Sequence, residues 1–352
     1  MNLNKIGLCN FFSDQVDSDL ELSQLARVIA VHKGECDITN GNIIRSAKMT
    51  GKMRHEAESK LDFPTVGDWV IVKSFNTDQI CQIERVLHRK NMLKRKNAGR
   101  SNNEQLIAAN IDTAFVIQAL GPSFSINRIE RFVVLINENN IIPKIILTKT
   151  DLLDQDECKK IKMLIHERIP NIDIFMCSNE TKKGLEEIES LFVSNKTYCL
   201  IGPSGVGKST LLNNLLGEDI LFTLPSNKET GRGVHSTTWR ELITLKNGAH
   251  VIDTPGLREL GYAEVNQGII ETFTDIEELS KKCYFKNCNH KNTKGCAIVN
   301  AVKQGTIEEK RFLNFLKISD EAKEAEKKEV QKITIHKKNY RFYRSSNKNK
   351  DN

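Results

Sequence analysis

The sequence predicts three structural parts: a small all-β barrel, an α/β domain built on a parallel sheet, and a helical segment that binds a metal. Short β-branched runs separated by turn residues indicate the barrel. Apolar strand-like runs that alternate with helical stretches indicate the α/β domain. Cysteines and a histidine clustered among helices indicate the metal site.

The barrel is predicted over residues 23–100, after a polar, acidic segment at 1–22 that we expect to be a flexible arm. Runs such as VGDWVIVKS alternate β-branched and polar residues and are bounded by Gly, Asn or Asp. Several short strands without a strong helix favour a small barrel, and the OB-fold is the commonest such barrel that binds nucleic acid.

The α/β domain is predicted over residues 101–265. Apolar strands such as IDTAFVIQAL, IPKIIL, IDIFM and YCLI alternate with helical runs such as INRIERFVVLINEN. Near-continuous apolar strands are typical of a parallel sheet covered by helices on both faces. The chain is then expected to be helical over 266–330, and a basic tail follows at 331–352.

Composition restricts the class of protein. The 352 residues suffice for two or three domains, and the net charge of +7 permits an RNA partner without requiring one. No apolar run approaches the roughly 18 residues that a membrane helix needs, and the N-terminus lacks the pattern of a signal peptide. We therefore expect a cytoplasmic, monomeric protein without membrane contacts, whose nine cysteines are reduced.

A phosphate-binding loop is predicted between a strand and a helix. The run GPSGVGKS matches G-x-x-x-x-G-K-[ST] in the context that this motif requires. Its glycines let backbone N–H groups face the phosphates, Lys208 reaches the β- and γ-phosphates, and Ser209 supplies an oxygen to Mg²⁺. The predicted phosphate-binding residues are Gly202, Pro203, Ser204, Gly205, Val206, Gly207, Lys208, Ser209 and Thr210.

Two further segments complete the predicted phosphate site. The run HVIDTPG is a strand that ends in D-x-x-G, where Asp253 would hold Mg²⁺ through water and the Gly256 N–H would sense the γ-phosphate. The loop GRGVHSTT lies between the two motifs, and its Thr237 is the preferred additional Mg²⁺ ligand. An ordinary polar loop is the alternative for any single residue there.

The run TKTD, which comprises Thr148, Lys149, Thr150 and Asp151, predicts a guanine pocket. The Asp151 carboxylate can accept hydrogen bonds from guanine N1–H and its 2-amino group, whereas adenine would leave this carboxylate unpaired. Thr148 stands where the usual N-K-x-D motif has Asn, so an amide that braces the pocket is lost. Ser178, in the run CSN, is expected in a second loop around the base. A capped helix start is the alternative interpretation of TKTD.

The order of these motifs predicts a circular permutation, because the base motif precedes the phosphate loop. A doubly wound sheet can be cut and rejoined elsewhere if its natural termini lie close together. The fold class is therefore a circularly permuted α/β P-loop GTPase between the OB-fold barrel and the helical metal-binding domain. Its second switch leads directly into that C-terminal domain, to which a movement that depends on the γ-phosphate would be transmitted.

A metal site is predicted at Cys283, Cys288, His290 and Cys296. Three thiolates and one imidazole form a tetrahedral set without a vacant position, which indicates one structural Zn²⁺ ion. Buried free cysteines and a redox switch are the alternatives.

Hydrolysis is expected to be slow without a partner. Many GTPases place a Gln after D-x-x-G to orient the attacking water, and here that position is Leu257. His235 is the best candidate to position or deprotonate water once a partner orders its loop, and a solvated histidine is the alternative. Arg232 is a competing charge donor to the γ-phosphate.

Two basic segments predict contacts with RNA. The run HRKNMLKRKNAGR at 88–100 joins the barrel to the α/β domain, and the tail mixes Lys and Arg with Tyr340, Phe342 and Tyr343. Phosphate contacts combined with aromatic stacking suit structured or single-stranded RNA. A solvated charged surface is the alternative.

Taken in order, VGDWV, TKTD, GPSGVGKST, GRGVHSTT, DTPG and the Cys/His cluster resemble the circularly permuted GTPases of small-ribosomal-subunit maturation, the RsgA or YjeQ family. The resemblance covers nearly the whole chain. Thr148 and Asn179 depart from the family pattern, which has Asn and commonly Ala at these positions.

The resemblance implies an N-terminal OB-fold, a permuted GTPase domain, a C-terminal zinc domain and a role for His235. It also implies hydrolysis of GTP to GDP and phosphate that is stimulated by the small ribosomal subunit. The small subunit and its rRNA would be partners, and other assembly factors would be further ones.

Two alternatives stay open on the residues alone. A nucleotide-gated RNA-binding protein with negligible hydrolysis would fit Leu257, and an ATPase would fit Thr148. Multiple-turnover hydrolysis with and without small subunits tests the first, and competition of GTP against ATP tests the second.

Overall fold

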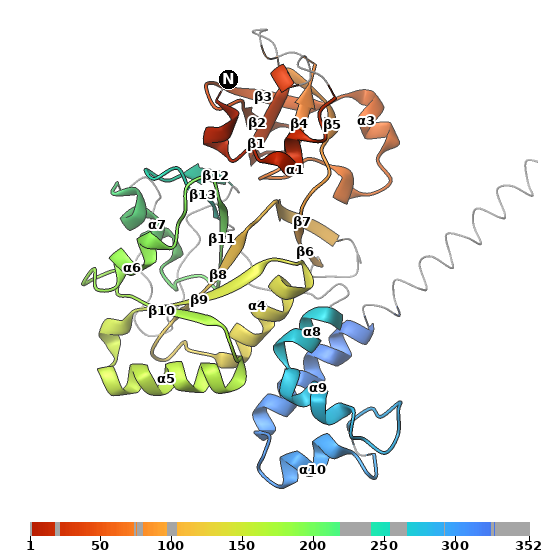
Figure 1. Cartoon of the computed structure of the whole chain (residues 1–352), viewed down its shortest axis with the longest axis vertical. Helices are drawn as coiled ribbons and strands as arrows, with labels where there is room; N and C mark the ends of the chain where they lie inside the picture. Colours follow the sequence, from red (N-terminus) through yellow and green to blue (C-terminus); the bar gives the residue numbers. More distant parts are fainter. Residues whose placement is uncertain are drawn as a thin grey trace, which may run out of the picture. The chain divides into compact units, whose positions relative to one another are not determined.

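The computed structural model (Figure 1) describes residues 2–17, 22–73, 75, 80–96, 104–218, 241–253, 266–291, 293–324 and 327. The chain forms two compact units. The first comprises Met1–Lys94 and Gln105–Leu260, and the second comprises Arg95–Glu104 and Gly261–Asn352. Within the described ranges, every helix is too short or too polar to cross a membrane.

A five-stranded barrel begins the first unit and confirms the predicted OB-type fold. Strand β1 pairs with β2 and β4, β2 pairs with β3, and β5 pairs with both β3 and β4, so the ring closes. Alternate side chains such as Ile38, Val70 and Ile83 fill its interior. The strands are β1 (Leu25–Val31), β2 (Cys36–Thr39), β3 (Ile44–Met49), β4 (Trp69–Val72) and β5 (Cys81–Val86).

The expectation of a flexible arm over 1–22 is wrong for residues 2–17. This segment forms the short helices η1 (Leu3–Ile6) and α1 (Asn10–Ser13). Leu3, Ile6 and Phe12 are buried in a cluster with Trp69 of the barrel, and the Phe12 and Trp69 ring centroids lie 5.7 Å apart. Burial of these few apolar side chains fixes a segment whose average composition is polar.

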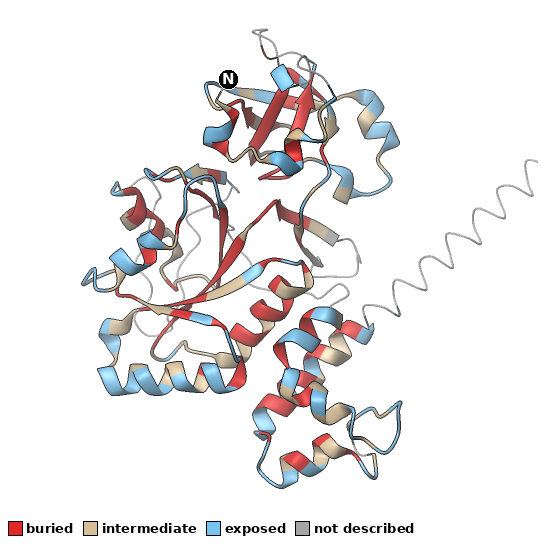
Figure 2. Ribbon diagram, viewed as in Figure 1, coloured by how far each residue is buried: buried red, intermediate tan, exposed pale blue. Residues whose placement is uncertain are grey.

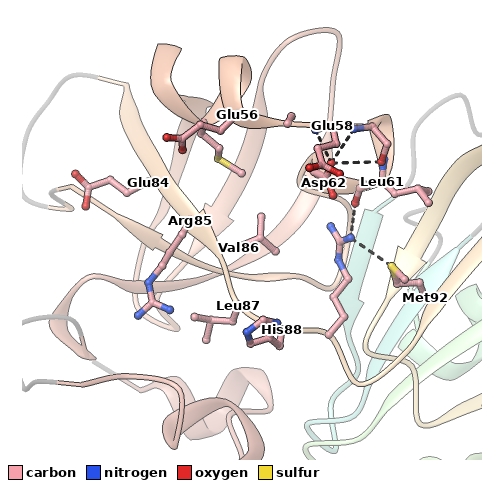
Figure 3. A pocket seen from close by; sticks show the side chains of 14 residues that line it. Glu56, Glu58, Leu61, Asp62, Glu84, Arg85, Val86, Leu87, His88 and Met92 are labelled. Atoms are coloured by element: carbon pink, nitrogen blue, oxygen red, sulfur yellow. Dashed lines mark hydrogen bonds between the residues drawn. The ribbon is translucent and has the colours of Figure 1, made fainter. Parts of the chain in front are cut away.

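A surface pocket of about 760 Å³ lies on the barrel beside α3 (Gly51–Glu56), η2 (Lys60–Asp62) and β5 (Figure 3). Glu56, Glu58 and Asp62 line it together with Arg85 and His88. Because acidic and basic groups share this pocket, its lining favours neither an anion nor a cation.

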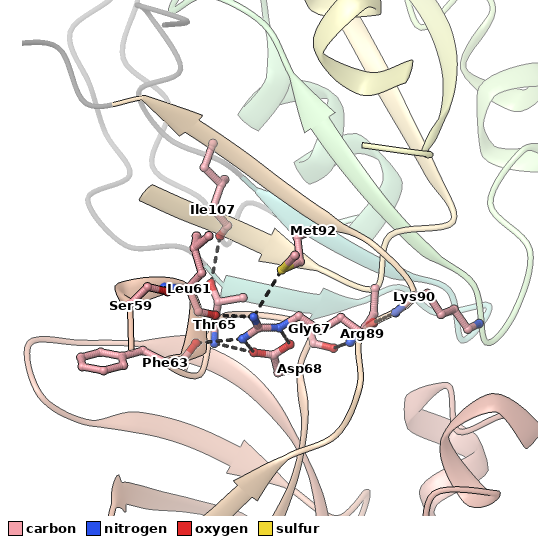
Figure 4. Close-up of polar contacts among 11 residues, drawn as sticks. Ser59, Leu61, Phe63, Thr65, Gly67, Asp68, Arg89, Lys90, Met92 and Ile107 are labelled. Carbon is pink, nitrogen blue, oxygen red and sulfur yellow. Dashed lines mark hydrogen bonds and ion pairs between the residues drawn. The ribbon is translucent and has the colours of Figure 1, made fainter. Parts of the chain in front are cut away.

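A buried ion pair joins the barrel to the segment that leaves it (Figure 4). Arg89 donates from Nε and Nη2 to the two carboxylate oxygens of Asp68, each at 2.7 Å, and also donates to the Leu61 and Phe63 carbonyls. Burial raises the pKa of Asp68, and the hydrogen bonds from Arg89 oppose that shift. The Arg89 side chain is only 11% exposed, so it does not contribute to the basic RNA-binding surface expected at 88–100.

The same region is bonded to the start of the α/β domain. Thr65 Oγ1 donates to the Ile107 carbonyl at 3.3 Å, and Asn110 Nδ2 donates to the Gly67 carbonyl at 3.0 Å. A Cβ at Gly67 would lie 2.2 Å from the Ala109 carbonyl oxygen, so only glycine permits this approach. Strands β6 (Met92–Lys96) and β7 (Glu104–Ala109) form a separate two-stranded sheet. The VGDWV run therefore helps to join the barrel to the α/β domain, through Gly67 and Asp68.

The α/β domain has the predicted parallel sheet, with strand order β10-β9-β8-β11-β13-β12. Neighbouring strands are parallel except β12, which is antiparallel to β13. Every residue of β8 and β11 is buried (Figure 2), as their continuous apolar runs predict. The strands are β8 (Thr113–Ala119), β9 (Ile142–Thr148), β10 (Asp173–Met176), β11 (Thr197–Ile201), β12 (Glu241–Thr244) and β13 (His250–Asp253).

Helices connect these strands, and their ends follow local signals. Ser125 caps α4 and Asp154 forms a capping box with Glu157 at the start of α5. The α4 side chains that face the sheet, including Phe132 and Ile136, are buried. The helices are α4 (Ile126–Glu138), η3 (Thr150–Leu152), α5 (Gln155–Arg168), α6 (Leu185–Ser190) and α7 (Lys208–Leu216).

The barrel also continues the sheet. Strand β1 pairs with β12 in antiparallel fashion at Ala30 and Glu241. Nearby, the buried Arg27 of β1 donates to the Ile6 carbonyl and to Thr197 Oγ1, both at 2.6 Å. One arginine thus binds the N-terminal segment and strand β11 at the same time.

The described part of the second unit is mainly helical, as predicted. It contains α8 (Asn266–Thr272), α9 (Thr274–Ser280), α10 (Ala297–Lys303) and a helical run over 309–324. Phe273 and Phe315 pack with ring centroids 5.6 Å apart. Arg311 donates to both carboxylate oxygens of Asp275, at 3.0 and 2.7 Å.

Candidate nucleotide site and metal cluster

The predicted phosphate loop turns between the end of β11 at Ile201 and the start of α7 at Lys208. Gly205 and Gly207 have φ values of 81° and 95°, which favour glycine. A Cβ at Gly202 would lie 2.3 Å from the Ile117 carbonyl oxygen, so the loop lies directly on β8. The Lys208 ammonium donates to the carbonyls of Gly202 and Pro203 at 2.8 and 2.9 Å, and it therefore lies over the loop.

The predicted base motif lies beside this loop, although it comes earlier in the sequence. Strand β8 lies between β9 and β11, and the three strands are parallel, so the segments that follow β9 and β11 lie close together at the carboxyl ends of the strands. Thr148 ends β9, is fully buried and donates from Oγ1 to the Val206 carbonyl at 2.6 Å. Lys149 adopts φ of 58°, and this left-handed turn leads into η3, which carries Thr150 and Asp151.

The structure brings Asp151 and Ser178 together. Ser178 Oγ donates to Asp151 Oδ1 and accepts from the Thr181 N–H at 3.1 Å. Asp151 is exposed while Ser178 is buried, so a fixed hydroxyl orients a carboxylate that faces outward. The neighbouring Cys177 is buried, and burial, followed by the charge of Asp151, raises its thiol pKa to about 12. This cysteine is therefore a neutral packing group.

Two asparagines that sequence reasoning did not select also contact the site. Asn179 Nδ2 donates to the Gly207 carbonyl at 3.1 Å, and Asn214 Nδ2 donates to Asn179 Oδ1 at 3.2 Å. Asn179 belongs to the run CSN, which was expected in a loop around the base, but this position did not reveal its partner in the phosphate loop.

Strand register places Asp253 beside the phosphate loop. Asp253 ends β13, is buried, and lies opposite Leu200 of β11, just before Gly202. This is the position expected for a carboxylate that holds Mg²⁺ near the phosphates. The other predicted residues of the two switches lie outside the described residues. These are Arg232, His235, Thr237, Gly256 and Leu257.

The predicted metal ligands converge in the second unit. The ligand atoms of Cys283, Cys288, His290 and Cys296 all lie within 4.8 Å of one another. Cys283 Sγ lies 3.8 Å from Cys296 Sγ, and His290 Nδ1 lies 3.7 and 3.5 Å from these two sulfurs.

These separations suit a tetrahedral ion. Zinc bonds of about 2.3 Å to sulfur and about 2.0 Å to nitrogen place ligand atoms about 3.5 to 3.8 Å apart. Cys296 is also the N-cap of α10, where its Sγ accepts from the Val299 N–H at 3.5 Å. The cluster can therefore hold a metal ion and fix the start of a helix.

Comparison with known proteins identifies the same family over most of the chain. The sequence model described as RsgA GTPase matches residues 86–263, and one described as 50S ribosome-binding GTPase matches 197–338. The small ribosomal subunit biogenesis GTPase RsgA 2 of Lactiplantibacillus plantarum is 38% identical over 324 residues, which cover 91% of this chain and 89% of the relative. The RsgA of Methanosarcina acetivorans is 32% identical and covers 90% of this chain and 84% of the relative.

Solved structures share the fold. YjeQ from Thermotoga maritima superposes with a TM-score of 0.61 at 27% identity, covering 85% of this chain and 98% of that one. YloQ, described as a circularly permuted GTPase, has a TM-score of 0.58 at 25% identity, with coverage of 85% and 95%. The predicted permuted fold is confirmed, since the base motif after β9 precedes the phosphate loop after β11 yet lies against it. The chain therefore belongs to the RsgA GTPase family.

Proposed function

We propose that this chain hydrolyses GTP to GDP and phosphate on the small ribosomal subunit and assists late maturation of that subunit. The hydrogen bond from Thr148 to the Val206 carbonyl carries the proposal, because it joins a guanine motif to a phosphate loop in one site. The relatives named for small-subunit biogenesis support the choice of partner. We further propose a cytoplasmic monomer that cooperates with other assembly factors.

In this proposal residues 202–210 bind the phosphates, and the segment 148–151 with Ser178 binds guanine. Ser209, Asp253 and Thr237 place the Mg²⁺ that accompanies GTP. That ion would neutralise charge on the phosphates. The Gly256 N–H would detect the γ-phosphate.

His235 would position the attacking water or accept its proton once the subunit orders the first switch. A site that lacks a Gln after D-x-x-G needs such a group from elsewhere, and the partner-dependent step keeps basal turnover slow. His235→Ala is expected to abolish the stimulated rate while GTP affinity stays near that of the wild type. An unchanged stimulated rate would exclude this role.

The barrel at 23–100 and the zinc domain at 266–330 would contact rRNA, with the GTPase domain at 101–265 between them and the tail at 331–352 adding charge. The described metal-binding loop supports this. Tyr284 is 80% exposed and Phe285 is 51% exposed, with ring centroids 4.9 Å apart. The run KKCYFKNCNHKNTKGC contains lysines and no acidic residue. Exposed aromatic rings among lysines suit RNA bases and phosphates.

The test is multiple-turnover GTP hydrolysis titrated with purified small subunits, with large subunits and the Lys208→Ala variant as controls. We expect slow turnover alone and a saturable increase with small subunits only. GTP-dependent subunit binding without any increase in turnover would instead support the nucleotide-gated RNA-binding alternative.

A further inference from the structure

We propose that Thr148 and Asn179 together form a phosphate-loop brace, which orients the loop N–H groups toward the phosphates of the nucleotide. The brace is defined as these two side chains and the carbonyls of Val206 and Gly207. The inference rests on the proposed assignment of GTP to this site. It assigns a positioning role to Thr148 and Asn179, which come from the two loops expected around the base.

The two side chains hold two successive carbonyls. Thr148 Oγ1 donates to the Val206 carbonyl at 2.6 Å, and Asn179 Nδ2 donates to the Gly207 carbonyl at 3.1 Å. In a trans peptide the C=O and the following N–H point in opposite directions, and the described chain has no cis peptide. The two carbonyls point toward the two loops expected around the base, TKTD at 148–151 and CSN at 177–179, which we call the base loops. The Gly207 and Lys208 N–H groups therefore point away from the base loops.

The Gly207 carbonyl accepts two hydrogen bonds. Besides the bond from Asn179, it accepts one from the Leu211 N–H at 2.9 Å, in the first turn of α7. A carbonyl oxygen has two lone pairs, so the helix and Asn179 can both be satisfied. The orientation of the Gly207–Lys208 peptide is therefore fixed both by the first turn of α7 and by Asn179.

The Asn179 amide is itself fixed from α7. Asn214 Nδ2 donates to Asn179 Oδ1 at 3.2 Å, and the Lys182 ammonium donates to Asn214 Oδ1. Because Asn214 holds the oxygen, the Asn179 amide nitrogen points toward the loop. A Cβ at Gly207 would lie 2.7 Å from that nitrogen, so the contact also requires glycine.

The two side chains each supply one donor. The threonine hydroxyl has one proton to donate, whereas an asparagine at position 148 would have an amide with two. Asn179 supplies the second donor, from the other loop around the base, to the next carbonyl. The base loops and the phosphate loop are thereby joined at two points.

The test compares Thr148→Val, Asn179→Ala and their double variant in the full chain, with Glu180→Ala as an exposed neighbouring control. Loss of one hydrogen bond should weaken binding of both GDP and GTP about two- to tenfold. The preference for GTP over ATP should be unchanged, because Asp151 is intact. The ³¹P resonance of the bound GDP β-phosphate should shift in both single variants.

A second double variant keeps the test decisive if Thr148→Val fails to fold. Thr148→Asn combined with Asn179→Ala should bind GDP within about twofold of the wild type, whereas Asn179→Ala alone should not. Wild-type affinity and an unchanged ³¹P shift in Asn179→Ala would overturn the brace. Failure of the wild-type chain to bind GTP would overturn the proposed function instead.

Discussion

At the scale of single residues, the junction and the site depend on polar side chains that are buried together with their partners. A buried polar group is tolerated when it is hydrogen-bonded and destabilises the fold when its partner is removed. Asp68, Thr148 and Arg27 are all buried, and each has a partner from a distant part of the sequence. Such pairs follow from the three-dimensional fold, so local sequence patterns do not reveal them.

Removing Arg89 should destabilise the first unit strongly. Arg89→Met leaves the Asp68 carboxylate, which is 0% exposed, without its bidentate partner. Loss of one member of a buried ion pair costs about 3–5 kcal/mol. Urea unfolding of the full chain measures this, and Lys52→Met is the control because the Lys52 side chain is 82% exposed. A loss equal to that of the control would contradict the structural role of this pair.

His250 should make stability depend on pH. It is fully buried at the start of β13, its Nδ1 lies 3.0 Å from Thr244 Oγ1, and burial followed by the charge of Arg27 lowers its pKa to about 3. In the unfolded chain the histidine binds a proton below about pH 6.5. The wild type should therefore keep the full contribution above pH 6.5 and lose it as the pH falls toward 3.

The measurement is the free energy of unfolding between pH 7.5 and pH 4.5 for the wild type and for His250→Gln. The wild-type curve should fall more steeply on acidification, by at most about 1.4 kcal/mol per pH unit for one proton. Equal slopes for the two proteins would show that His250 does not remain neutral when folded.

At the scale of helices and strands, the sequence predicted most of what the structure contains. Strands β8 and β11 are buried on both faces, so their continuous apolar runs identified them. The metal cluster was predictable because its ligand chemistry is specific. The packing of segment 2–17 could not be predicted, because Phe12 is buried by contact with Trp69, which lies far along the sequence.

The metal cluster should control the order of its loop. Cys288→Ser removes one ligand of the proposed zinc ion but leaves the Cys296 cap of α10 in place. We expect the zinc content to fall below one per chain and hydrogen exchange to rise over 281–296, while basal GTP turnover stays near that of the wild type. Cys158→Ser, outside the cluster, is the control. Full zinc content in Cys288→Ser would contradict the assigned ligand set.

At the scale of the whole molecule, the permutation determines which elements follow the nucleotide site. The chain leaves β13 at Asp253 and continues into the second unit, whereas the base motif is reached first, through the barrel and β8. The motif order could be predicted from sequence. The junction between barrel and sheet could not, because it is made by Arg27, Arg89 and Asn110 with partners far along the chain.

The pairing of β1 with β12 has a consequence for self-association. An uncovered edge strand offers unpaired N–H and C=O groups to other copies of the same chain. Here Ala30 of the barrel pairs with Glu241 and covers part of the edge strand β12.

A chain that starts at Gln105 should therefore form concentration-dependent oligomers in light scattering, while the full-length chain at the same concentration should not. A monomeric truncated chain would contradict this. The barrel therefore also protects the edge strand β12 from pairing with another copy of the chain.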